Sequence, residues 1–212
     1  SEPQIAVVQQ NLRQVRTAID LYSYPAWREH GQQQLADGLE PLMRSAEPGS
    51  DHQLAFARSF AASARSDEHL DLVAALLDGT EELPGLVIDT DLRWSLLLRL
   101  VVTGRRGPDA IEAELARDDT AAGRRHAASL RAALPDADAK AAAWASMIDD
   151  DSLPNAVLGA TMGGFQQPDS VDLLRPYVQK YLDAIEGVFA PRTTEMAQSI
   201  AISLYPMLVV EQ

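Results

Sequence analysis

The fold is decided by residues 89–104, "DTDLRWSLLLRLVVTG", an apolar run that two arginines interrupt. Leu92, Leu96 and Arg99 recur at spacings of four and three, which is the period of a helix with one face on a core. A buried guanidinium without a partner is strongly destabilising. We therefore expect Arg99 to be held by a group on a neighbouring helix, and contact with a substrate in a wet groove is the alternative.

The second arginine of this run lies near the start of the helix. Thr90 is the predicted N-cap, which places Arg93 in the first turn. A cation there opposes the helix dipole, so a compensating partner is expected. Asp89 and Asp91 are the nearest acidic residues. We predict that Arg93 and Arg99 form structural pairs with carboxylates or with backbone carbonyls, and that neither is catalytic.

Helical periodicity continues along the whole chain, and strand signals are confined to "GLVID" at residues 85–89. Ser66 or Asp67, Thr120 and Asp136 are expected N-caps, and Pro176 should kink or divide a late helix. The pattern predicts about ten or eleven helices with short connections. Their expected ranges are 4–21, 25–44, 53–64, 68–77, 90–104, 108–117, 120–134, 137–148, 154–161, 170–188 and 193–205.

This succession of helices predicts an all-α fold. Antiparallel pairs of helices of about this length suggest an α-solenoid of HEAT or armadillo type, although no strict sequence repeat is visible. No linker is long enough to demand a second domain, so residues 1–212 are expected to form one helical domain. The chain begins without a methionine, so we expect that it was processed or was cut from a longer protein.

Composition excludes several classes of partner. The chain has 212 residues, with 18 Lys and Arg against 31 Asp and Glu, for a net charge of −13. Such a surface repels phosphate backbones, so nucleic acid is not expected as a partner. No apolar run approaches the ~20 residues of a membrane helix, so no membrane association is expected. The chain has no cysteine, which favours a reducing compartment, and we predict a cytoplasmic location.

No catalytic or metal-binding motif stands out. The four histidines are not spaced as a helical zinc pair, and His69 in "DEHLD" is interpreted as part of a helix start. The three acids at residues 149–151 are interpreted as loop caps because adjacent carboxylates need a preorganised loop to share an ion. "GATMGG" at residues 159–164 is not a P-loop, since no strand precedes it and the lysine is missing. We predict no catalytic residue, no metal ligand and no cofactor in this chain.

Three stretches together carry a family resemblance. They are residues 89–104, residues 111–144 ("IEAELARDDTAAGRRHAASLRAALPDADAKAAAW") and residues 164–189 ("GFQQPDSVDLLRPYVQKYLDAIEGVF"). In this order they resemble the C-terminal helical domain of aminopeptidase N-type zinc metallopeptidases, with the bacterial, actinobacterial members most similar. The resemblance extends over nearly all of the chain.

The resemblance implies an accessory role. In that family the domain is helical with HEAT-like pairs, follows the catalytic domain, roofs the active-site cavity and shapes peptide access. The chemistry of the family depends on zinc, held by H-E-x-x-H with a downstream Glu, and on G-x-M-E-N. Neither motif occurs here. We therefore expect a C-terminal fragment that is not an enzyme alone, whose partners are the catalytic domain of the same polypeptide and peptide substrates. A free-standing α-solenoid that binds another protein is the alternative.

The best candidate for contact with a peptide is the segment from Gly163 to Pro168, "GGFQQP". Its glycines permit unusual backbone angles, and its glutamine amides can bond a peptide backbone. Phe165, Gln166 and Gln167 are the predicted contacts. An ordinary turn between helices is the alternative.

Overall fold

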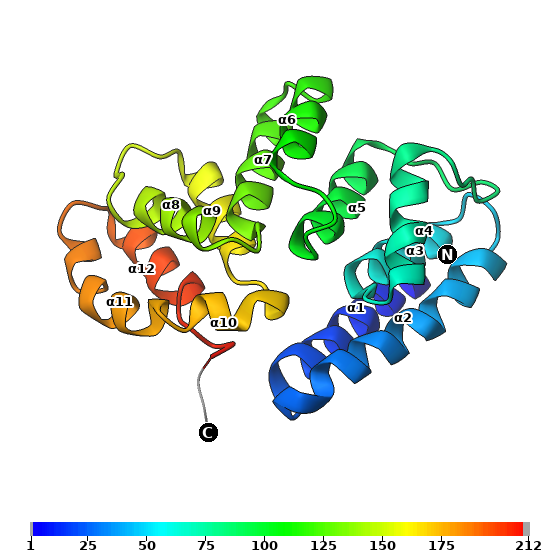
Figure 1. The fold of residues 1–212 in the computed structure, drawn as a ribbon, viewed down its shortest axis with the longest axis horizontal. Helices are drawn as coiled ribbons and strands as arrows, with labels where there is room; N and C mark the ends of the chain where they lie inside the picture. Colours follow the sequence, from blue (N-terminus) through cyan, green and yellow to red (C-terminus); the bar gives the residue numbers. More distant parts are fainter. Residues whose placement is uncertain (1, 210–212) are drawn as a thin grey trace. The chain divides into compact units, whose positions relative to one another are not determined.

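The computed structural model describes residues 2–209, and every regular element in that range is helical. Twelve α-helices follow one another in this range, where about ten or eleven were predicted, and the all-α class is confirmed, whereas the HEAT or armadillo type stays a prediction (Figure 1). No strand forms at residues 85–89 in this described range. No described helix is long and apolar enough to cross a membrane.

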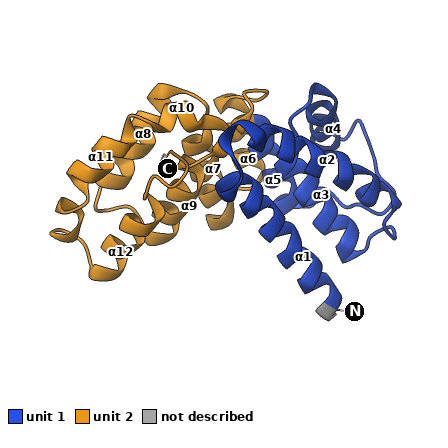
Figure 2. Ribbon diagram, turned by 90° about the horizontal axis from the view of Figure 1, so that it is seen from below, with its two compact units in different colours: residues 1–100 blue, residues 101–212 orange. Residues whose placement is uncertain are grey.

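The chain divides into two compact units, residues 1–100 and residues 101–212 (Figure 2). Each unit has its own buried side chains, and each is described separately below. The expectation of one domain over the full length stays a prediction.

The first unit is built on two helices joined by a short connection, α2 (Arg28–Ser45) and α3 (Asp51–Ser63), which pack along each other (Figure 1). Before them come α1 (Glu2–Thr17), a π-helical turn η1 (Ala18–Tyr22) and a 3₁₀ turn η2 (Pro25–Trp27). After them come α4 (Asp67–Asp78) and α5 (Thr90–Val102), which crosses the division between the units. The core contains Leu39, Met43, Phe60, Val73 and Trp94.

Helix α2 differs from its prediction in two respects. The first three residues of the predicted range form the 3₁₀ turn, so the α-helix begins at Arg28. It ends at Ser45, one residue beyond the predicted range, and continues through Gly31, Gly38 and Pro41, although glycine and proline ordinarily weaken or kink a helix. The six-membered ring of Trp27 lies so close to Gly31 that a Cβ there would be 2.3 Å from it. Gly31 therefore serves close packing and does not mark a break.

The second unit is organised around α7 (Ala121–Ala133) and α9 (Asn155–Phe165), which pack along each other. Helices α6 (Pro108–Arg117) and α8 (Ala137–Ile148) flank this pair. The chain continues through η3 (Pro168–Ser170), α10 (Val171–Leu174), α11 (Tyr177–Ala184), η4 (Gly187–Phe189) and α12 (Thr194–Ser203). Pro176 separates α10 from α11, which confirms the predicted break.

Local signals position most helix starts correctly. The side chains of Ser66, Thr120 and Asp136 accept hydrogen bonds from backbone N–H groups of α4, α7 and α8. The start of α5 differs from the prediction, because Asp89 is the residue before the helix. Its Oδ1 accepts a hydrogen bond of 2.7 Å from the N–H of Leu92. A carboxylate at this place also complements the positive end of the helix dipole, which a threonine cannot do.

Candidate functional site

The buried arginine of α5 binds the end of another helix. Arg99 is 4% exposed, and its Nε donates a hydrogen bond of 2.5 Å to the carbonyl of Ala64, the C-cap of α3. Ala64 is fully buried, so its carbonyl needs a partner within the protein. This position gives Arg99 a structural task in the first unit, and a substrate role has no support in the geometry.

Arg93 makes a similar contact with α4. Its Nη1 donates a hydrogen bond of 3.0 Å to the carbonyl of Leu77 in the last turn of that helix. Asp89 and Asp91 are both exposed, and Asp89 caps α5. Pairing of Arg93 with either acid stays a prediction, whereas its bond to a helix end is a feature of the structure.

In the second unit, Lys140 of α8 also binds carbonyls at helix ends. Its side chain is fully buried, and its Nζ donates hydrogen bonds of 2.6 Å to the carbonyl of Ala132 and 2.9 Å to that of Phe165. These carbonyls belong to the last turns of α7 and α9, where the helix dipole favours a cation. The Nζ also lies 5.4 Å from the centre of the Phe165 ring. Burial lowers the pKa of Lys140 to about 8.

Arg192 is a fourth cationic side chain that binds the end of a helix. Arg192, between η4 and α12, donates from Nη2 to the carbonyls of Met147 and Ile148, at 3.1 and 2.8 Å, and so covers the end of α8. The helices α3, α7, α8 and α9 all end without a glycine at the C-cap. A glycine cap is the common way to satisfy the last carbonyls of a helix. In this chain the side chains of Arg99, Lys140 and Arg192 bind such carbonyls instead.

The predicted peptide-contacting segment is mostly helical. Helix α9 continues to Phe165, so Gly163 and Gly164 lie inside it and neither has a positive φ. The expectation of unusual backbone angles there is wrong. A Cβ on Gly164 would lie 1.9 Å from the carbonyl oxygen of Ser129, whereas Gly163 has no atom within 4 Å. Gly164 therefore permits the close approach of α9 to α7.

The three candidate side chains hold parts of the second unit together. Phe165 is 3% exposed, and its ring packs against Tyr177 and Trp144, with centroids 5.0 and 6.0 Å away. Gln166 donates from Nε2 to the carbonyls of Ser203 and Tyr205, at 2.6 and 3.1 Å, at the end of α12. Gln167 donates from Nε2 to Gly164 O at 3.2 Å. A peptide that approached these donors would compete with bonds already made.

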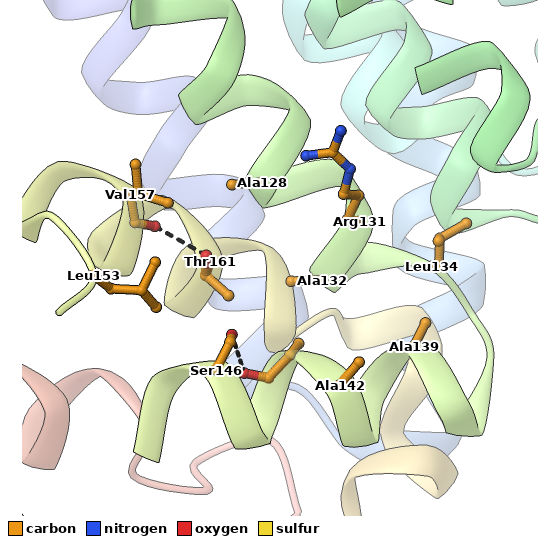
Figure 3. A pocket seen from close by; sticks show the side chains of 11 residues that line it. Ala128, Arg131, Ala132, Leu134, Ala139, Ala142, Ser146, Leu153, Val157 and Thr161 are labelled. Atoms are coloured by element: carbon orange, nitrogen blue, oxygen red, sulfur yellow. Dashed lines mark hydrogen bonds between the residues drawn. The ribbon is translucent and has the colours of Figure 1, made fainter. Parts of the chain in front are cut away.

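The second unit contains a hollow of about 420 Å³ between α7, α8 and α9 (Figure 3). Five of its eleven lining residues are alanines, and larger apolar side chains lie at Leu134, Leu153 and Val157. The hydroxyls of Ser146 and Thr161 bond carbonyls of their own helices, Ala143 and Val157. At its edge Arg131 is bound to Glu112 by two hydrogen bonds, of 3.0 and 2.7 Å. The hollow therefore offers an apolar surface with little hydrogen-bonding capacity.

The acidic clusters give no metal centre. His69 is buried, with Nε2 3.5 Å from Oδ1 of Asp37 and from Oε2 of Glu40. Glu40 also binds Arg44 at 2.8 Å. Within residues 2–209, no group of three or more His, Asp or Glu side chains could hold a metal ion.

The acidic run at residues 149–151 serves local structure. Asp149 is the C-cap of α8, and Asp150 accepts hydrogen bonds from the backbone and hydroxyl of Ser152. These bonds hold the pKa of Asp150 below its usual range. The interpretation of this run as loop caps agrees with these contacts.

Comparison with known proteins adds two findings. The family model described as "ERAP1-like C-terminal domain" matches residues 1–212. An aminopeptidase N of Streptomyces lividans is 51% identical over 211 residues, which is 100% of this chain and 25% of that protein. The chain therefore spans about a quarter of the length of this relative.

Proposed function

Because the chain belongs to the ERAP1-like C-terminal domain family, we propose that it acts as the non-catalytic C-terminal domain of a zinc aminopeptidase that removes N-terminal residues from peptides. The observation that carries the proposal is the identity of 51% to an aminopeptidase N over the whole chain. The zinc and the catalytic acids would lie in the remaining three quarters of the polypeptide. A cytoplasmic location stays a prediction that rests on the lack of cysteine. The free-standing interaction module is not favoured.

In this proposal the domain roofs the active-site cavity and shapes how peptides enter it. A domain in this position has to be rigid, because a flexible cavity wall cannot discriminate between substrates. The buried cations support this role, because each one fixes the end of a neighbouring helix. The apolar hollow between α7, α8 and α9 would suit an aliphatic side chain of a peptide, since it contains few polar groups.

The experiment compares the complete polypeptide with the 212-residue chain. The complete polypeptide should bind zinc and hydrolyse an aminoacyl-anilide, and a chelator should abolish the hydrolysis. The chain alone should do neither, because its described residues hold no ligand set. A complete polypeptide without chelator-sensitive hydrolysis would remove the basis of the proposal.

A second experiment tests the candidate contacts Phe165, Gln166 and Gln167 in the complete polypeptide. Gln166→Ala removes two hydrogen bonds to the end of α12. If Gln166 contacts a peptide away from its N-terminal residue, KM should rise for long peptides, by the equivalent of about 0.5–1.5 kcal/mol, and stay unchanged for a one-residue anilide. Equal changes for both substrates would show that Gln166 only supports the fold.

A further inference from the structure

The surface of α1 and η1 carries a second, largely apolar stripe beside the one that packs on its own unit. The inner stripe is Ile5, Val8, Leu12 and Ile19, which are half-buried except for the buried Ile19. The outer stripe is Val7, Asn11, Val15, Ala18 and Tyr22, at spacings of four, four, three and four, which place its members on one side of a helix.

The outer stripe is exposed throughout. Val7 is 58% exposed, Val15 45% and Tyr22 80%, and Asn11 and Ala18 are also exposed. Two further aromatic residues follow directly, Tyr24 at 77% and Trp27 at 43%. Single exposed apolar residues are ordinary, but a row of them that runs into exposed aromatic residues is typical of an interaction site.

The end of this stripe is held in a fixed position. Asp20 in η1 is buried, and its Oδ1 and Oδ2 accept hydrogen bonds from Gln32 Nε2 at 2.5 Å and Arg16 Nε at 3.2 Å. The hydroxyl of Ser23 donates a bond of 2.6 Å to the carbonyl of Ile19. These contacts present Tyr22 on a preorganised turn, which lowers the entropy lost when a partner binds.

The charge of this segment also differs from that of the chain. Across residues 2–27 only Glu2, Arg13, Arg16 and Asp20 are charged, so the segment has no net charge, although the chain carries −13. Its remaining polar residues are largely uncharged amides. Depletion of charge and enrichment in tyrosine and tryptophan mark the centres of protein interfaces. The partner surface is accordingly apolar and uncharged.

We infer that the outer stripe and Tyr24 and Trp27 are the surface that docks this domain onto the preceding part of the same polypeptide. The inference rests on the proposed function. The relative is four times as long as this chain, and the family is a C-terminal domain, so most of the protein precedes α1. Helix α1 is the first helix in the part of the chain that the structure describes.

Cysteine protection in the complete polypeptide tests the inference. Val15→Cys and Tyr22→Cys place thiols on the outer stripe, and Gln9→Cys is the matched control, exposed on the opposite side of the same helix. Alkylation by iodoacetamide, followed at each site by mass spectrometry, should be about tenfold or more slower at positions 15 and 22 than at position 9. Equal rates at the three positions would overturn the inference.

A photo-crosslink identifies the occupant. With p-benzoylphenylalanine in place of Tyr22, crosslinked peptides should come from residues that precede this chain. Crosslinks to a second copy, or to residues within the 212, would overturn the inference. Both readouts are independent of hydrolysis, so an inactive polypeptide with a protected stripe would refute the proposed function and leave the docking surface standing.

Discussion

Deprotonation of Lys140 should make the protein more stable as the pH rises. Burial lowers the pKa of this residue from 10.5 to about 8. Above pH 10.5 the lysine is neutral in both states, and its burial has no ionic cost. As the pH falls through 8, the folded protein must take up a proton that the unfolded chain already holds. The shift from 10.5 to about 8 corresponds to about 3 kcal/mol of stability lost below pH 8.

The comparison with Lys140→Met isolates this effect. The variant removes the titrating group and the hydrogen bonds to Ala132 and Phe165. Urea unfolding of both proteins from pH 7 to pH 10.5 gives the difference in free energy of unfolding between wild type and variant. That difference should rise in favour of the wild type by about 2–3 kcal/mol across this range. Other titrating groups, such as the tyrosines, cancel in the difference.

Two results would refute the reasoning. A difference that stays constant with pH would mean that burial does not perturb the lysine. A difference that falls with pH would mean that the two helix ends favour the ammonium by more than burial opposes it. In that case Lys140 would be a permanent cation that stabilises the second unit at neutral pH.

Three further predictions concern stability and metal content. Arg99→Leu should lower the free energy of unfolding, measured in urea, by about 1–3 kcal/mol, because the buried carbonyl of Ala64 loses this donor. An unchanged free energy of unfolding would contradict the capping role of Arg99. Gly164→Ala should lower it by about 1–3 kcal/mol through the clash with Ser129. Gly163→Ala should instead raise it by about 0.5–1 kcal/mol through helix propensity, and similar effects at the two glycines would refute the packing argument. The 212-residue chain should retain no stoichiometric zinc after dialysis, as checked by atomic absorption.

Features that depend on neighbours in sequence were predictable. Ser66, Thr120 and Asp136 cap helices that begin within three residues of them, so their role follows from local pattern alone. Pro176 divides a helix for an equally local reason. The all-α class follows from the sum of such signals.

Features that depend on distant contacts were not predictable. Gly164 was expected to be a turn residue. Its small size is instead required by the backbone of Ser129, which lies 35 positions earlier. The sequence indicated that Arg99 needs a partner. That partner is the backbone carbonyl of Ala64, also 35 positions earlier, and a backbone carbonyl cannot be recognised from the residue type. The hollow between α7, α8 and α9 was missed because it arises from alanines, whose small size only matters once three helices face one another.

The carbonyls at several helix ends are bound by side chains that come later in the sequence, and this affects folding during translation. Leu77 is made 16 residues before Arg93, Ala64 35 residues before Arg99, and Ile148 44 residues before Arg192. At about 5–20 residues per second, the end of α3 would wait about 2–7 s for the donor that completes it. The order of translation therefore leaves these helix ends without the named donors until a later segment emerges. Nascent fragments cut just before residue 99 should be more sensitive to protease at the end of α3 than fragments that extend beyond it.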